Sequence, residues 1–218
     1  MNQFQHKFNV YDQLAYILVG LYTLGVAWVL YVLIFSAEPS SLINFLKIEF
    51  TIGLILCAYL VGHLVQAASN AFEWWEKKKK EEKHVDLAFI TAKAREFFSL
   101  PKELPDKFVW QYCYLYALSN DFSGHVALFN SLYSLYRGFW IATLIGMFVS
   151  LVIFLQQVVV SIINKFSIWP DWRLFVFALF AFLSAMLFSK RKERFFNYMN
   201  EKTLITYDIL VKNLIDKK

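Results

Sequence analysis

Glycine, cysteine and histidine are scarce in this chain, which has seven glycines, two cysteines and four histidines among 218 residues. There is no glycine-rich phosphate loop, no G-x-S-x-G nucleophile turn and no H-E-x-x-H metal motif. Cys57 and Cys113 fall in different parts of the expected topology, which argues against a disulfide and leaves no cysteine metal site. The sequence therefore predicts a protein that is not an enzyme and that has no metal or cofactor.

Charged residues are missing from long stretches of the chain. Apolar residues make up 58% of the sequence and aromatic residues 19%, and the apolar share exceeds that of a typical soluble domain. Residues 50–72 carry no charge, and a helix of that length, roughly 35 Å, can cross a bilayer core. Four such segments predict an all-α protein with four transmembrane helices that extend into a helical cytoplasmic layer.

The uncharged runs and the charges between them set the expected boundaries. The transmembrane helices are expected at residues 13–37, 50–72, 138–164 and 172–189. The remaining parts are a cytoplasmic N-terminus at 1–12, outer loops at 38–49 and 165–171, a helical cytoplasmic insert at 73–137 and a helical cytoplasmic tail at 190–218.

Basic residues are distributed unevenly around these spans. All of the 22 lysines and arginines except Lys47, Lys165 and Arg173 fall in the N-terminus, the insert and the tail. Because positive residues near spans remain in the cytoplasm, both termini are expected there. A run of four lysines follows the second span directly and is interpreted as a topology signal that also contacts anionic lipid. This run is Lys77, Lys78, Lys79 and Lys80.

The insert and the tail are expected to be helical. Residues 71–100 contain no glycine or proline, which allows the second span to continue as one long helix. After a proline-flanked break, Asp106 is expected to cap a helix over residues 106–118. A third helix is expected to run from His125 without interruption into the third span. The tail carries one apolar stripe suited to packing on a partner helix, formed by Leu204, Tyr207, Val211 and Leu214.

The second span carries three polar residues, His63, Gln66 and Asn70, at spacings that place them on one helix face. Polar groups in lipid need partners, and an intramembrane histidine is a candidate functional residue. One interpretation is interhelical hydrogen bonding, helped by the small residues Gly62 and Ala67. A second is the lining or gate of a pore. A metal site is the third, but no other ligand falls at suitable spacing on this span.

Five basic residues mark the cytoplasmic ends of the third and fourth spans. They are Arg137, Lys190, Arg191, Lys192 and Arg194. Together they can ring one vestibule and bind an anion such as a nucleotide or short nucleic acid, since arginine binds phosphate through two parallel hydrogen bonds. Aromatic residues of the insert can stack on bases. The alternative is that basic residues stand at helix exits in any membrane protein.

Two short segments resemble a known group of proteins. They are YDQLAY at residues 11–16 and YLVGHLVQA at residues 59–67. Together with the four-span plan, the helical insert and the basic tail, they resemble small bacterial membrane proteins of anti-phage defence, and the chain is similar to the channel effector of the Hailong system. There, a partner nucleotidyltransferase makes short DNA oligomers that hold a tetrameric channel shut, and their loss opens it.

The resemblance implies a bacterial inner-membrane protein that assembles into a homo-oligomer, such as a tetramer, with a cytoplasmic anion-binding chamber. We therefore expect an ion channel effector that arrests growth and is gated by a nucleotide or DNA oligomer. The alternative is a membrane anchor or scaffold that recruits a soluble partner through the insert. An intramembrane enzyme built on His63 would need a second catalytic group, and none is visible in the sequence.

Overall fold

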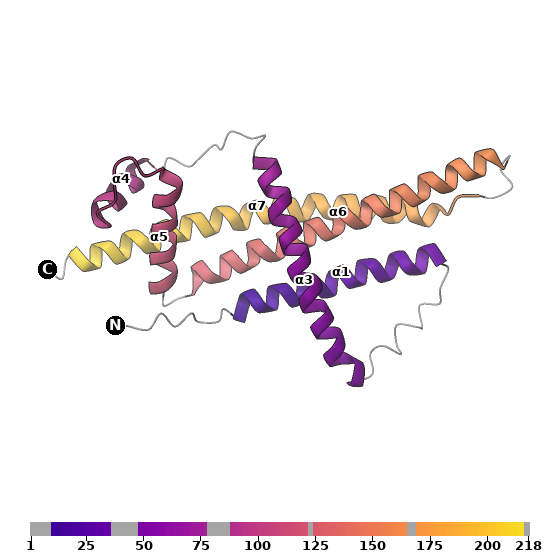
Figure 1. Cartoon of the computed structure of the whole chain (residues 1–218), viewed down its shortest axis with the longest axis horizontal. Helices are drawn as coiled ribbons and strands as arrows, with labels where there is room; N and C mark the ends of the chain where they lie inside the picture. The colour runs from indigo at the N-terminus through magenta and orange to yellow at the C-terminus, as the bar shows by residue number, and fades with distance from the viewer. Residues whose placement is uncertain (1–9, 36–47, 78–87, 122–123, 165–168, 216–218) are drawn as a thin grey trace. The chain divides into compact units, whose positions relative to one another are not determined.

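The computed structural model describes residues 10–35, 48–77, 88–121, 124–164 and 169–215, and most of these residues are helical. The helices follow one another along the chain as shown in Figure 1. They are α1 (Val10–Phe35), α3 (Ile48–Lys77), α4 (Ala88–Phe97), α5 (Asp106–Asn120), α6 (His125–Ile163) and α7 (Trp172–Ile215). α1, α3, α6 and α7 are long and apolar enough to cross a membrane. The prediction of an all-α, multi-pass membrane protein with four spans is confirmed.

The helices extend beyond the expected spans. α6 starts at His125 and continues unbroken through the third span, as expected. The fourth span and the described part of the tail, which ends at Ile215, form the single helix α7. The predicted extension of the second span reaches Lys77 in α3, but its continuation through residues 78–87 lies outside the described residues. Lys78, Lys79 and Lys80, most of the 38–49 loop and residues 165–168 also lie outside them.

The expected cap of α5 is wrong. Pro105 occupies the N-cap position without a side-chain hydrogen bond, and Asp106 is the first helical residue. The Asp106 carboxylate instead accepts a hydrogen bond from Arg95 of α4, at 2.7 Å. Proline is tolerated here because the first amides of a helix have no acceptor within the helix. The aspartate therefore ties α5 to α4 instead of capping its own helix.

The chain divides into two compact units, which are described separately. Unit 1 comprises Met1–Glu73 and Ser134–Lys192, and unit 2 comprises Trp74–Tyr133 and Glu193–Lys218. α6 and α7 each contribute one segment to both units. Unit 1 thus contains most of the uncharged sequence together with residues 134–137 and 190–192, and unit 2 contains the rest of the tail and nearly all of the insert.

In unit 1, α3 crosses α1 at two glycines (Figure 1). A Cβ atom added to Gly20 would lie 1.6 Å from the Ala58 carbonyl oxygen, and one added to Gly62 would lie 1.9 Å from that of Tyr16. Only glycine permits this approach of two backbones, and small residues commonly provide it between membrane helices. The pairing of Gly20 with Ala58 and of Gly62 with Tyr16 shows that α1 and α3 are antiparallel.

The interior of unit 1 combines apolar packing with paired hydroxyl groups. Its buried core consists of Val19, Val65, Ile141 and Ala142. The Tyr22 and Thr143 hydroxyls are 2.7 Å apart and share a hydrogen bond between α1 and α6. Ser150 donates to the Leu174 carbonyl at 2.6 Å and joins α6 to α7. These bonds satisfy polar groups that lipid cannot solvate.

Unit 2 has an aromatic core formed by α4, α5, the start of α6 and the end of α7. Its buried members are Ala94, Val109, Cys113, Ala117, Val126 and Tyr207. Tyr207 lies 6.2 Å from both Phe97 and Tyr116, measured between ring centroids. Burial raises the pKa of the Cys113 thiol to about 11 and also raises the pKa of Tyr207. The tail stripe therefore packs through Tyr207 and Val211 within its own chain.

Candidate functional site

Gln66 of α3 connects its helix to α6. The side chain is 4% exposed. Its Nε2 donates a hydrogen bond to the Ser134 carbonyl at 2.6 Å, and its Oε1 accepts one from Arg137 Nη2 at 3.0 Å. Gly138 gives the amide this space, because an added Cβ there would lie 3.1 Å from Gln66 Nε2. The polar group predicted for packing or gating is thus engaged by the adjacent helix.

The hydrogen bond from Arg137 to Gln66 joins two groups of residues for which the sequence predicted different functions. It belongs to the predicted anion-binding set, and Gln66 belongs to the predicted gate. Arg137 is partly buried, and a buried cation requires hydrogen-bond partners. The bond to Gln66 Oε1 is charge-assisted and stronger than a bond between neutral groups. A change at Arg137 therefore alters the contact between α3 and α6.

Lys192 of α7 lies near the same part of α6. Its Nζ is 3.9 Å from the centroid of the Trp140 ring, a cation–π contact. Trp140 follows Arg137 by three residues, so the two lie close on the surface of α6. Trp140 also meets α3 through Phe72, at 5.3 Å between ring centroids. Segments of α3, α6 and α7 therefore converge around Arg137 and Trp140.

The other predicted anion ligands are more scattered. Lys190 and Arg191 are exposed on α7 within unit 1. Arg194 is also exposed but belongs to unit 2. A ligand at this site would thus be held by Arg137 and Lys192 at the helix junction, with Lys190 and Arg191 available from the exposed surface of α7.

The three polar residues of the second span have different surroundings. His63 stacks on Tyr16 of α1 at 4.0 Å between ring centroids and meets the edge of Tyr59 at 4.5 Å. Gln66 is buried against α6, whereas Asn70 is exposed. His63 thus supports the α1–α3 crossing through a ring contact, and Gln66 supports the α3–α6 contact through hydrogen bonds.

A small cavity in unit 1 was not anticipated from the sequence. It measures about 120 Å³ and is lined by Tyr22, Val26, Thr143, Phe177, Phe180, Ala181 and Ser184. The sequence shows only that three different spans each carry a hydroxyl residue, namely Tyr22, Thr143 and Ser184. Tertiary packing is what brings these three residues together. The cavity has space for a few water molecules rather than for an ion path. Within the described residues, no three His, Cys, Asp or Glu side chains gather as metal ligands.

A side-chain amide near the C-terminal end of α6 bonds to the residue that precedes α7. Gln157 Oε1 accepts a hydrogen bond from the Asp171 backbone amide at 2.8 Å, and Gln156 is exposed. Hydrogen bonds from Arg173 hold the pKa of Asp171 below its usual value. One of the two adjacent glutamines is therefore satisfied by a contact between helices.

Comparison with known proteins adds no relative. No protein-family model, curated protein or solved structure matches this chain.

Proposed function

We propose that this chain is the subunit of a homo-oligomeric ion channel, controlled by an anionic ligand that contains phosphate groups. The ligand class is a nucleotide or short DNA oligomer, and the ligand engages the basic residues at the junction of α6 and α7. The channel acts as an effector that arrests growth in anti-phage defence at the bacterial inner membrane.

The hydrogen bond from Arg137 to Gln66 carries this proposal. A phosphate oxygen that binds Arg137 competes with Gln66 Oε1 for the same guanidinium N–H groups. Ligand binding at α6 then loosens or redirects the contact to α3, a membrane-spanning helix. A ligand changes an equilibrium only through such differential contacts between two states.

Assembly of several copies follows from the small interior of unit 1. Its described cavity is about 120 Å³, and the hydroxyl groups of Tyr22, Thr143 and Ser150 form hydrogen bonds between helices. An ion path requires a continuous polar pore. In a homo-oligomer, such a pore forms along the symmetry axis between subunits.

The ligand class and the defence role rest on two further supports. Basic residues with arginine geometry suit phosphate groups, and Arg137, Lys190, Arg191 and Lys192 belong to one unit. The segments at residues 11–16 and 59–67 resemble small bacterial membrane proteins of anti-phage defence, and the four-span plan with a helical insert and a basic tail is similar to the channel effector of the Hailong system. A gene for a nucleotidyltransferase next to the gene for this chain would support the same role.

The alternative function is a membrane anchor that recruits a soluble partner through unit 2. It is favoured by the exposed apolar residues of α5, which include Phe108, Tyr112 and Leu115. This function requires a monomeric membrane part and a stable complex with another protein.

Electrical recording from the purified protein in planar bilayers tests the proposal. We expect unitary currents that short DNA oligomers suppress, and Arg137→Gln should weaken the suppression without preventing insertion. Lys107→Gln, which removes an exposed positive charge from α5 outside the four candidate spans, is the matched control and should leave both properties unchanged. An absence of current with and without oligonucleotides, from correctly inserted protein, would reject the channel.

A further inference from the structure

The uncharged segments of three helices in unit 1 end beside one another. The candidate span of α3 ends at Phe72. The span of α6 is preceded by Arg137, and that of α7 is followed by Lys190. Trp140 joins the three ends, because its ring centroid lies 5.3 Å from that of Phe72 and 3.9 Å from Lys192 Nζ. The three boundaries between uncharged and charged sequence thus lie at one level, which we call the span junction.

The opposite end of α7 places the span junction at a surface of the membrane. Trp169 and Trp172, at the start of α7, are 80% and 68% exposed, and tryptophan is enriched where a span meets water. Lys192 follows Trp172 by 20 residues (172 to 192) in one helix, which is about 30 Å, the thickness of a bilayer core. The span junction therefore lies in the headgroup layer of the opposite leaflet.

Two cations lie close together at the span junction. Arg137 precedes Trp140 by three residues, so both lie on one side of α6, and Lys192 lies over the Trp140 ring. Arg137 and Lys192 are each partly buried. Like charges that are partly removed from water repel each other, and a phosphate group in contact with both relieves this repulsion.

The net charge around the span junction is also positive. The segments 66–73, 134–140 and 189–193 contain four positive and two negative residues, which leaves a net charge of +2. Basic pockets between spans are typical binding sites for the headgroups of anionic phospholipids. The headgroup layer supplies such phosphates at high local concentration.

Apolar surface continues from the basic residues into the membrane. Leu183 and Leu187 are 49% and 64% exposed on α7, and Arg191 follows them at spacings of four residues, so the three share one helix face. An acyl chain can lie along the two leucines while its headgroup remains at the level of Arg191. A phosphate without an acyl chain cannot use this surface.

We infer that the span junction binds the phosphate group of an anionic phospholipid, with Arg137 and Lys192 as its ligands and the acyl chains along α7. This inference goes beyond the proposed function by naming a lipid ligand. It rests on the proposed function in one respect: lipid and oligonucleotide compete for Arg137, so the oligonucleotide must displace the lipid to act.

Native mass spectrometry of the full chain in a neutral detergent tests the lipid site. The probes are dioleoylphosphatidylglycerol, dioleoylphosphatidylcholine with the same acyl chains, and glycerol 3-phosphate without acyl chains. We expect the phosphatidylglycerol to bind about tenfold more tightly than the phosphatidylcholine, because of the positive charges at the site. Glycerol 3-phosphate should bind more weakly than either lipid.

Substitutions locate the site. Arg137→Gln and Lys192→Gln should each weaken the binding of phosphatidylglycerol about fivefold, because each removes one positive charge. Lys192→Gln leaves the hydrogen bond from Arg137 to Gln66 in place, so its effect does not come from a loosened contact between α3 and α6. Lys192→Arg keeps the charge and should retain the preference.

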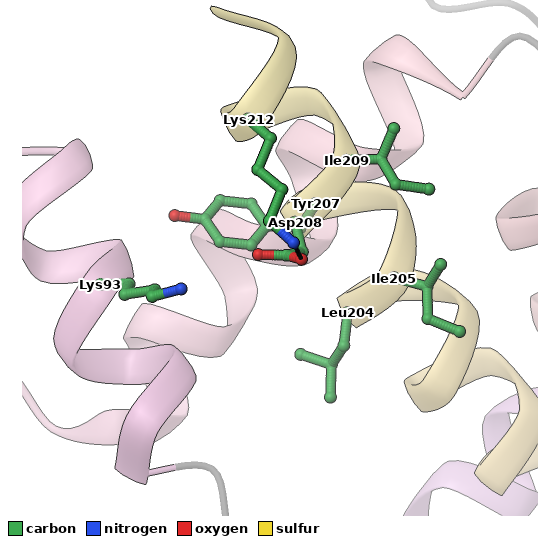
Figure 2. A pocket seen from close by; sticks show the side chains of 7 residues that line it. All are labelled: Lys93, Leu204, Ile205, Tyr207, Asp208, Ile209 and Lys212. Carbon is green, nitrogen blue, oxygen red and sulfur yellow. Dashed lines mark ion pairs between the residues drawn. The ribbon is translucent and has the colours of Figure 1, made fainter. Parts of the chain in front are cut away.

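Lys212 of unit 2 provides the matched control on the same helix. It lines a groove of about 410 Å³ with Lys93 and is ion-paired with Asp208 at 2.6 Å (Figure 2). Lys212→Gln removes one positive charge outside the span junction and should leave the preference for phosphatidylglycerol unchanged.

Three results would overturn the inference: equal binding of the two lipids, unchanged binding in both glutamine variants of the span junction, or equally tight binding of glycerol 3-phosphate. If oligonucleotides suppress a current but no lipid preference is found, the lipid site fails and the channel proposal stands. If the lipid preference is found but the protein conducts no current, the lipid site stands and the channel proposal fails.

Discussion

Units 1 and 2 differ in the side chains that join their helices, although α6 and α7 contribute to both. Unit 1 buries the polar residues Gln66, Thr143 and Ser150 and exposes large apolar side chains such as Leu64 and Phe148. Unit 2 buries aromatic and aliphatic side chains around Tyr207. The first arrangement suits lipid and the second suits water. A continuous helix such as α6 or α7 can therefore pass from lipid into water, because only the composition of its side chains has to change along its length.

Exposed apolar residues have different surroundings in the two units. Leu64, 71% exposed on α3, lies in a membrane-spanning segment, where lipid covers it. Leu115, 61% exposed on α5, lies in a helix outside the four candidate spans. Apolar stripes in water mark interaction surfaces. Exposure alone is therefore uninformative in this protein until the surrounding solvent is known.

The largest expected effect concerns the α1–α3 crossing of unit 1. Gly20→Ala should destabilise unit 1 by about 4 kcal/mol or more, above the usual cost of overpacking, because its Cβ meets the Ala58 backbone. Denaturant titration in detergent micelles measures this loss. Gly25→Ala on the same helix is the control, since a Cβ there meets no atom within 4 Å. Equal stability of the two variants would contradict the crossing.

Two substitutions of Tyr207 test whether the stability of unit 2 depends on the aromatic ring or on the hydroxyl group of this residue. Tyr207→Ala should cost about 3 kcal/mol through the cavity left in the aromatic core. Tyr207→Phe should be neutral or stabilising, because the buried hydroxyl has no hydrogen-bond partner among the described residues. Thermal unfolding followed by near-ultraviolet circular dichroism compares them. A loss in the phenylalanine variant as large as in the alanine variant would show that the hydroxyl is satisfied.

The junction of α3 and α6 should respond less strongly. Gln66→Leu should cost about 2 kcal/mol, because it removes the Oε1 acceptor from Arg137 and the donor from the Ser134 carbonyl. A double-mutant cycle with Arg137→Met measures the coupling of the pair. Asn70→Leu, exposed on the same helix, should change stability little. Additive single effects in the cycle would refute the coupling on which the proposed gating depends.

The basic surface of α7 should affect ligand binding more than folding. Reversing the charge at Lys190 and Arg191 to glutamate should weaken the binding of a short DNA oligomer about tenfold at moderate salt, by losing phosphate contacts. Fluorescence anisotropy measures the affinity, and membrane fractionation checks insertion. Lys107→Glu on α5 is the charge control. Unchanged affinity in the double variant would remove these two residues from the proposed site.

The smallest expected effect concerns the end of α4 in unit 2. Ser99 has a φ of 52°, and the Leu100 amide donates to the Arg95 carbonyl at 2.9 Å, which together form a Schellman cap. Ser99→Gly should stabilise unit 2 by about 0.5 kcal/mol, because glycine adopts a positive φ without a steric cost. Ser119→Gly inside α5 should instead destabilise it. Urea titration compares the two, and a loss of stability in Ser99→Gly would contradict the cap.

Several features of the fold could be predicted because they depend on local sequence. Uncharged runs required the four spans, since lipid solvates neither charges nor unpaired backbone groups. The uninterrupted helix from His125 followed from the absence of glycine and proline before Gly138. The cap of α5 was predicted wrongly, because Asp106 has an alternative partner in Arg95 that lies eleven residues earlier.

The candidate site was only partly visible in the sequence. Arg137 and Gln66 were both recognised as notable residues, but 71 positions separate them, and no local pattern indicates that they touch. Trp140 was not recognised at all, because one more aromatic residue in a span carries no distinguishing signal. Its contact with Lys192 depends on the packing of α6 beside α7.

By itself, the sequence determined whether each segment suits lipid or water, since the hydropathy of a segment depends on its composition alone. It also determined where helices can continue, since glycine and proline act on the adjacent backbone. Only the tertiary structure decided which polar groups meet inside unit 1 and which apolar residues of unit 2 remain uncovered. Those outcomes depend on the rotation and depth of each helix against its neighbours, which are set by many weak contacts acting together.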